Sequence, residues 1–150
     1  MNAAPPLVLL LHGPNLNLLG ERQPEVYGTA TLADHVATTE QALAPHGLVV
    51  EAFQSNHEGA IVDAIHGARR RCAAIIINPG AFTHYAWSIH DALAAFDGPI
   101  VELHLSNPDS RESWRHTSVV SPVATGIISG FKGDGYRLAV EAVAGLLEDA

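Results

Sequence analysis

The chain has 150 residues, 47% of them apolar, which is enough for the core of one globular domain. A formal net charge of −8 at pH 7 disfavours nucleic acid and anionic membranes as partners, because both would repel the protein. Cys72 is the single cysteine, which excludes a disulfide framework or a cysteine-based zinc site and favours a reducing, cytoplasmic location. We expect no secretion signal in residues 1–6 and no membrane span, because no apolar run is long enough.

In chain order, short apolar or β-branched runs alternate with segments of helical periodicity. We predict buried parallel strands at residues 7–11, 49–53, 74–77, 100–105 and 126–131. Thr31 and Asp34 have the spacing of a helix capping box, and Gly47 ends that helix. Apolar stripes within residues 61–68, 89–93 and 136–147 indicate further helices. This alternation predicts one α/β domain over residues 1–150, doubly wound and flavodoxin-like, with a five-stranded parallel sheet of order 2-1-3-4-5.

That strand order predicts a single binding crevice. Ligands of open α/β sheets bind beyond the carboxyl ends of the strands, near the point where the strand order reverses. Strands 1, 3 and 4 are neighbours in this order, and polar-rich segments follow each of them, at residues 15–27, 78–84 and 104–115. We therefore expect these three segments to converge.

The connection after the first strand is unusually long. Residues 13–30, which we call the flap, exceed what a strand-to-helix turn needs, whereas residues 1–6 before the strand form a short tail. Tyr27 could be a packed loop aromatic, but Arg22 precedes it by five residues, and a phenol acts as a base only where a cation stabilises its phenolate. Asn15 and Asn17 could both make turn hydrogen bonds; Asn15 is also placed to hold a water or a developing oxyanion.

The segment Asn78-Pro79-Gly80-Ala81-Phe82-Thr83-His84 follows the third strand. An ordinary turn with Thr83 as a helix cap accounts for its proline, glycine and threonine, but not for Asn78 and His84 together. Asp91 lies two helical turns after His84, so both should occupy nearly the same helical face. Taken alone, Asp91 would be a solvated carboxylate.

Glu102, His104 and Ser106 alternate along the fourth strand, so they should share one side of it. An edge strand with one solvated face would look similar, but this strand is internal in the predicted order. A carboxylate two residues from a histidine can orient the ring and hold it as imidazolium, as a general acid requires.

These segments resemble the type II 3-dehydroquinate dehydratase family. The resemblance rests on GPNLNLLG at 13–20, R-x-P-x-x-Y-G at 22–28, NPGAFTH at 78–84, ELHLS at 102–106 and RESWRHTS at 111–118. It implies the trans-elimination of water from 3-dehydroquinate to give 3-dehydroshikimate through an enolate, in the shikimate or quinate pathway. Departures from the family pattern are Phe82, Ser113 and Lys132, where tyrosine, proline and glycine are frequent.

The resemblance also implies roles for individual residues. Tyr27, as a phenolate beside Arg22, would be the base, a water held by Asn15 would stabilise the enolate, and His104, oriented by Glu102, would be the acid. The substrate-binding groups it implies are Asn78, His84, Asp91, the Leu105 backbone, Ser106 and Arg115, with Arg115 a better match than Arg111. Asp91 would reach the site of a neighbouring subunit in a homododecamer, a tetramer of trimers.

Other chemistries fit the sequence less well. A flavin-binding flavodoxin, a response-regulator receiver and an α/β-hydrolase would each need a motif that this chain lacks. A catalytically inactive scaffold would have no reason to combine Tyr27, Arg22 and His104. Lys132 is the only lysine, and we predict it to lie away from the loops after strands 1, 3 and 4, which disfavours a Schiff base. The other histidines lack metal-ligand spacing, so we expect neither a metal nor a cofactor.

Overall fold

The computed structural model describes residues 3–150, so Met1 and Asn2 of the predicted tail lie outside the described residues, and residues 3–6 form no helix or strand. Five parallel strands form one sheet in the order β2-β1-β3-β4-β5, which confirms the predicted topology. The strands are β1 (Leu7–His12), β2 (Val49–Gln54), β3 (Cys72–Asn78), β4 (Ile100–His104) and β5 (Gly126–Ser129).

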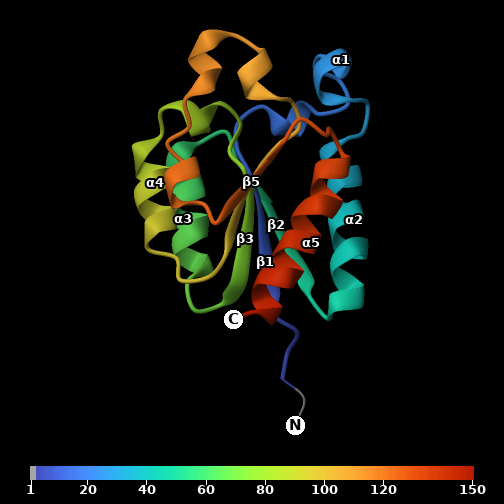
Figure 1. Ribbon diagram of the computed structural model, residues 1–150, viewed down its shortest axis with the longest axis vertical. Helices are drawn as coiled ribbons and strands as arrows, with labels where there is room; N and C mark the ends of the chain where they lie inside the picture. Colours follow the sequence, from blue (N-terminus) through green and yellow to red (C-terminus); the bar gives the residue numbers. More distant parts are fainter. Residues whose placement is uncertain (1–2) are drawn as a thin grey trace.

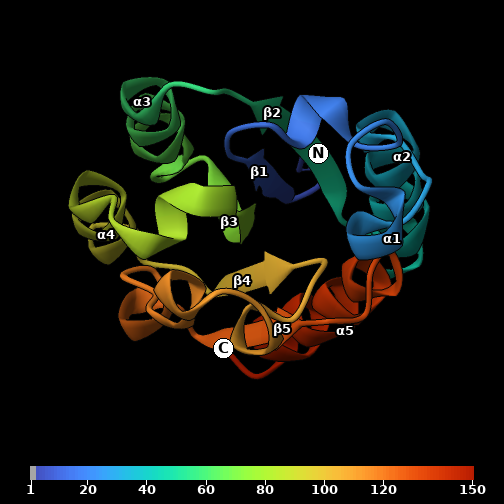
Figure 2. The same ribbon diagram turned by 90° about the horizontal axis from the view of Figure 1, so that it is seen from above.

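Helices cover both faces of the sheet. Helices α3 (Glu58–Ala68) and α4 (Trp87–Ala94) pack on one face, and α2 (Leu32–Leu43) and α5 (Asp134–Glu148) pack on the other (Figures 1 and 2). The α-helix α1 (Pro24–Tyr27) and the 3-10 turns lie in the loops: η1 (Leu16–Leu18), η2 (Ala44–His46), η3 (Gly80–His84), η4 (Pro108–Ser110), η5 (Ser113–His116) and η6 (Ser121–Val123).

Alternating apolar side chains on the central strands build two separate cores. On β3, Ile75 and Ile77 face the α3/α4 side, whereas Ala74 and Ile76 face the α2/α5 side, and all four are fully buried. Burial of both faces is typical of a parallel sheet and explains why these strands read as nearly continuous apolar runs.

The predicted elements agree with the structure except at some ends. Thr31 and Asp34 do form a reciprocal capping box at the start of α2. The fifth strand stops at Ser129 instead of residue 131, because Gly130 turns the chain with a φ of +96°. Within residues 3–150 no helix is long and apolar enough to cross a membrane.

The expectation that His84 and Asp91 share a helical face is wrong. His84 ends the 3-10 turn η3, and α4 begins only at Trp87. Tyr85 and Ala86 have non-helical backbone angles, so the helical phase is lost between the two elements.

Candidate active site

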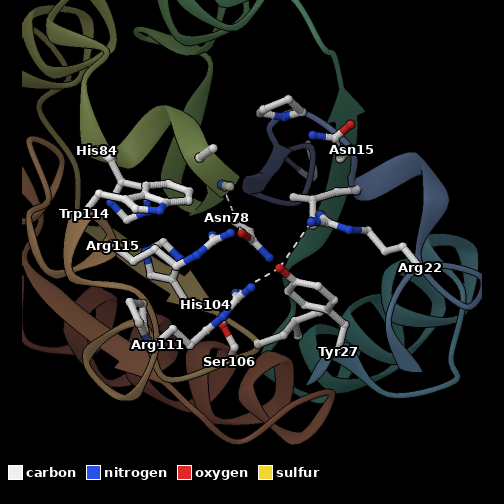
Figure 3. Close-up of a pocket in the computed structure, with 16 residues that line it drawn as sticks. Asn15, Arg22, Tyr27, Asn78, His84, His104, Ser106, Arg111, Trp114 and Arg115 are labelled. Carbon is white, nitrogen blue, oxygen red and sulfur yellow. Dashed lines mark hydrogen bonds between the residues drawn. The ribbon is translucent and has the colours of Figure 1, made fainter. Parts of the chain in front are cut away.

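A cavity of about 220 Å³ lies beyond the carboxyl ends of β1, β3 and β4, at the end of the molecule where Figure 1 places α1. Its walls come from the three segments that were expected to converge (Figure 3). The lining residues are Pro14, Asn15, Leu16, Arg22, Tyr27, Asn78, Gly80, Ala81, His84, His104, Leu105, Ser106, Pro108, Arg111, Trp114 and Arg115.

The loops after β1 and β3 meet at two glycines. A Cβ atom on Gly13 would lie 2.1 Å from the Pro79 carbonyl oxygen, so only glycine fits there. Gly80 has a φ of +58°, and a Cβ on it would lie 3.1 Å from the Pro14 carbonyl oxygen. This close approach fixes one side of the cavity with backbone instead of mobile side chains.

The flap is anchored by its apolar side chains. Leu16, Leu19 and Tyr27 are buried and join the core on the α2/α5 side, whereas Leu18 is exposed. Tyr27 is the last residue of helix α1. Its ring points toward the cavity, and its hydroxyl faces the loop after β4 (Figure 3). Flap packing therefore sets the position of the phenol.

Two guanidinium groups converge on the Tyr27 hydroxyl. Arg22 donates from Nη2 at 3.2 Å, and Arg111 donates from Nη1 at 2.9 Å (Figure 3). The Arg22 guanidinium carbon also lies 4.4 Å from the centre of the Tyr27 ring. Charge-assisted donors of this kind stabilise a phenolate more than a neutral phenol, and each is worth roughly 1.5–3 kcal/mol.

Sequence reasoning preferred Arg115 and undervalued Arg111. Arg111 bonds both Tyr27 and the Ser106 hydroxyl, the latter at 3.1 Å, which joins the flap to the loop after β4. Arg115 also lines the cavity, where it pairs with Glu112 and stacks 4.0 Å from the Trp114 ring centre. The feature of the sequence that could have identified Arg111 is its position five residues after Ser106, in the same loop.

His104 and Glu102 form a buried pair at the end of β4. The His104 Nε2 atom lies 2.5 Å from Glu102 Oε2, which leaves Nδ1 as the ring nitrogen available to a ligand. Glu102 is 1% exposed and His104 is 9% exposed. The two side chains therefore share one side of the strand, as the alternation predicted.

Hydroxyl groups that sequence reasoning did not select hold the Glu102 carboxylate. Thr83 and Ser118 approach its Oε2 atom at 2.8 and 3.0 Å, and Ser121 donates to Oε1. Burial alone raises the pKa of Glu102, but the hydrogen bonds and charge of His104, with those of Ser121 and Thr83, outweigh it and leave the pKa lowered. Thr83 therefore serves the carboxylate and does not cap a helix.

In Figure 3, His84 lies on the side of the cavity away from Arg22 and Tyr27, and Asn78 lies between His84 and Tyr27. The Asn78 Oδ1 atom accepts the Gly80 N–H at 3.3 Å, and His84 Nδ1 lies 2.7 Å from the Thr117 carbonyl oxygen. Burial lowers the pKa of His84, with further lowering by the charges of His104 and Arg115. A neutral His84 that donates through Nδ1 keeps Nε2 as a hydrogen-bond acceptor.

Of the remaining predicted residues, Asn15, Leu105 and Ser106 line the cavity, and Asp91 does not. Asn15 has a φ of +68°, and its backbone N–H donates to Asn56 Oδ1 at 3.0 Å. Asp91 is exposed on α4. The structure therefore brings together ten of the eleven predicted residues if Glu102, held behind His104, is counted with the lining residues.

The prediction that Lys132 lies away from these loops is wrong. Its backbone N–H bonds the Leu105 carbonyl at 2.9 Å, and its Cδ lies 3.9 Å from where a Cβ on Gly28 would be. The reason is the parallel pairing of β4 with β5, in which Ser129 lies opposite His104. The residues that follow Ser129 therefore lie beside the loop that follows β4. Lys132 is still not among the residues that line the cavity.

The charge of the cavity is opposite to that of the whole chain. Three of the eight lysine and arginine side chains line it, and the lining includes no aspartate or glutamate, whereas the chain carries a net charge of −8. Such a site suits a small anion that carries hydroxyl groups. In residues 3–150 no group of three or more histidine, cysteine, aspartate or glutamate side chains is arranged to hold a metal ion.

Comparisons with known proteins agree with this geometry. The model of the family "Dehydroquinase class II" matches residues 6–144. A catabolic 3-dehydroquinase of Penicillium rubens is 55% identical over 136 residues, which cover 91% of this chain and 88% of the relative. A 3-dehydroquinate dehydratase 2 of Pseudomonas putida is 51% identical over 144 residues, covering 96% of this chain and 97% of that protein. The type II dehydroquinase structure from Propionibacterium acnes superposes with a TM-score of 0.89 at 41% identity, covering 93% of this chain and 96% of its own.

Proposed function

Because the chain belongs to the class II dehydroquinase family, we propose that it dehydrates 3-dehydroquinate to 3-dehydroshikimate with Tyr27 as the general base and His104 as the general acid. The enzyme is a hydro-lyase of the shikimate or quinate pathway. The observation that carries the residue assignments is the pairing of two guanidinium groups with the Tyr27 hydroxyl, opposite a buried His104–Glu102 pair, in one cavity.

In the first step the Tyr27 phenolate removes a proton from the carbon next to the ketone. The electron pair of that C–H bond moves onto the carbonyl oxygen and forms an enolate. Arg22 and Arg111 keep the phenolate available by donating to it. A water held by Asn15, which lines the same cavity, stabilises the enolate oxygen.

In the second step the enolate returns its electron pair to form the carbon–carbon double bond, and the β-hydroxyl group leaves. His104 protonates this hydroxyl so that it departs as water. The Glu102 carboxylate, ionised and held by the surrounding hydroxyls, orients the ring and stabilises its charged form. No cofactor, metal or covalent intermediate takes part in this route.

Substrate contacts follow from the remaining polar groups of the cavity. Arg115 supplies a cation for the carboxylate, and Asn78, His84, Ser106 and the Leu105 backbone bind the carboxylate and ring hydroxyls. With Nδ1 occupied by Thr117, His84 offers Nε2 to a hydroxyl donor.

The assembly is a homododecamer built as a tetramer of trimers. The position of Asp91 supports this assembly. Asp91 is exposed on α4 and does not line the cavity of its own chain, so it could contact a substrate only in a neighbouring subunit. A cytoplasmic location fits the unpaired, buried Cys72.

The direct test is the rise in ultraviolet absorbance of the conjugated enone when 3-dehydroquinate is added to the purified protein. Tyr27→Phe should lower turnover by at least ~10²-fold, since positioned acid–base groups contribute about that much or more. Tyr85→Phe is the matched control, because Tyr85 is 59% exposed and outside the cavity. Near wild-type turnover of Tyr27→Phe would remove the proposed base while leaving the activity in place.

A further inference from the structure

Trp114 lines the substrate cavity but has no role in the chemistry described above. It belongs to the 3-10 turn η5, in the loop after β4. The residue is 53% exposed and belongs to neither apolar core, so the packing of the fold does not explain its position. In Figure 3 its indole lies beside His84 and Arg115, two of the groups assigned to the substrate.

The Trp114 indole contacts the flat face of the Arg115 guanidinium. The guanidinium carbon lies over the indole, 4.0 Å from the ring centre. Tryptophan is the side chain that attracts cations most strongly in this arrangement. The N–H groups of a guanidinium lie in its plane, so a contact with its face leaves them available to other partners. The indole therefore restricts the plane of the Arg115 guanidinium without occupying its donors.

Glu112 restricts the rotation of the same guanidinium within its plane. Arg115 Nε donates to Glu112 Oε2, and the Arg115 backbone N–H donates to the Glu112 carbonyl oxygen at 2.9 Å. Among the described residues, the terminal nitrogens Nη1 and Nη2 of Arg115 make no hydrogen bond. They are the donors with which an arginine binds a carboxylate through two parallel hydrogen bonds. In Figure 3 the Arg115 side chain extends into the cavity, where such a carboxylate would lie.

The loop after β3 keeps the Trp114 indole in place. The His84 and Trp114 ring centres are 5.2 Å apart and the ring planes meet at 84°, which is an edge-to-face contact. His84 is fixed in turn, because its Nδ1 atom lies 2.7 Å from the Thr117 carbonyl oxygen. Trp114 therefore contacts a held ring as well as the arginine, so an exposed indole can still impose an orientation on its neighbour.

We propose that Trp114 and Glu112 are positioning residues, which hold Arg115 with its terminal N–H groups directed at the substrate carboxylate. The proposal rests on the proposed function in assigning Arg115 to that carboxylate. An arginine held in advance loses less conformational freedom on binding, which increases affinity. The carboxylate keeps its charge throughout the elimination, so Arg115 contacts it equally in the ground state and the transition state. Loss of either positioning residue should therefore raise KM and leave kcat nearly unchanged.

Steady-state kinetics in the enone assay test the role of Trp114. Trp114→Ala should raise KM for 3-dehydroquinate roughly 3- to 30-fold, the range that a cation–π contact is worth, with kcat within about threefold. Trp114→Phe keeps an aromatic face against Arg115 and should recover most of the wild-type KM. Both variants should fold, because the residue is half exposed. An unchanged KM in Trp114→Ala, or a KM in Trp114→Phe as high as in Trp114→Ala, would overturn the proposal.

Two variants of Glu112 test whether it positions Arg115 or competes with the substrate for it. Glu112→Gln keeps an oxygen that accepts from Arg115 Nε, whereas Glu112→Ala keeps none. A positioning role predicts a KM raised roughly 2- to 5-fold in Glu112→Ala and close to wild type in Glu112→Gln. An unchanged KM in Glu112→Ala, or a lowered KM in both variants, would overturn this role. Asp134→Asn is the matched control, because Asp134 pairs with Arg137 at the same i,i+3 spacing outside the cavity.

A double-mutant cycle with Arg115→Gln separates an effect through Arg115 from direct contact with the substrate. If Trp114 acts through Arg115, Trp114→Ala should raise the KM of Arg115→Gln by less than about twofold. Full additivity in free energy would mean that Trp114 contacts the substrate itself or acts through His84, and would overturn the proposal while leaving the proposed function in place. An unchanged KM in Arg115→Gln would instead overturn the assignment of Arg115 to the carboxylate, which belongs to the proposed function, and the positioning role with it.

Discussion

Replacing His12 with leucine should make the fold less sensitive to acid. His12 is fully buried at the end of β1, and burial together with the charge of His35 lowers its pKa from 6.5 to about 3. The folded protein therefore resists protonation of this ring, whereas the unfolded chain takes up a proton near pH 6.5. Because the pKa is lower in the folded state, this contribution to stability is present above pH 6.5 and is lost as the pH falls toward 3.

The size of the effect follows from the two pKa values. With 6.5 for the unfolded chain and about 3 for the folded one, linkage gives a loss of about 2 kcal/mol between pH 7 and pH 5. Complete protonation below pH 3 would cost about 5 kcal/mol, which is comparable to the whole stability of a small domain. His35 and His84 also have lowered pKa values, but they are present in both proteins and leave the comparison intact.

Urea unfolding followed by circular dichroism at pH 7, 6 and 5 measures the difference. All samples are kept at one protein concentration, because the measured stability of a protein that self-associates depends on concentration. The free energy of unfolding of wild type should fall by about 2 kcal/mol more than that of His12→Leu over this range. Parallel pH dependences would mean that His12 is solvated or protonated in the folded protein.

Three further predictions concern the site. Glu102→Gln should lower turnover by roughly 10²-fold and alter its pH profile, because the neutral amide no longer stabilises the charged His104 ring; an unchanged profile would contradict the orienting role. Arg111→Gln should lower kcat by more than about tenfold in the enone assay, whereas Arg137→Gln, exposed on α5, should not. Hydrogen exchange of residues 20–28 should slow when 3-dehydroshikimate binds, and equal protection with and without it would make the segment a fixed wall.

The topology and the place of the site could be predicted because both depend on local patterns. Alternating apolar runs set the strand positions, and strand order then determines which loops meet beyond the carboxyl ends. Glu102 and His104 could be paired from sequence because period-2 alternation alone sets them on one side of β4. Tyr27 and Arg22 are separated by five residues, so the short helix α1 suffices to bring them together.

What could not be predicted depends on contacts between distant segments. Arg111 reaches Tyr27 across 84 residues, and Tyr136 reaches His12 across 124, distances over which no spacing rule applies. His12 and His35 were therefore assigned no role, although both pack against Tyr136. The break between His84 and Asp91 was missed because Tyr85 and Ala86 have no sequence signature of a helix end such as glycine or proline.

Lys132 gives the sharpest test of the mechanism, because it lies nearer to the site than its sequence position suggested. A Schiff-base route needs an uncharged amine in contact with the ketone carbon, whereas Lys132 is exposed and outside the cavity lining. Its φ of +49° favours glycine, so Lys132→Gly should keep the turn intact and Lys132→Ala should strain it slightly. Both variants should retain activity, and borohydride added to wild type with 3-dehydroquinate should neither inactivate the enzyme nor increase its mass. A reduced substrate adduct on Lys132 would overturn the enolate mechanism, and with it the roles given to Tyr27 and Arg111.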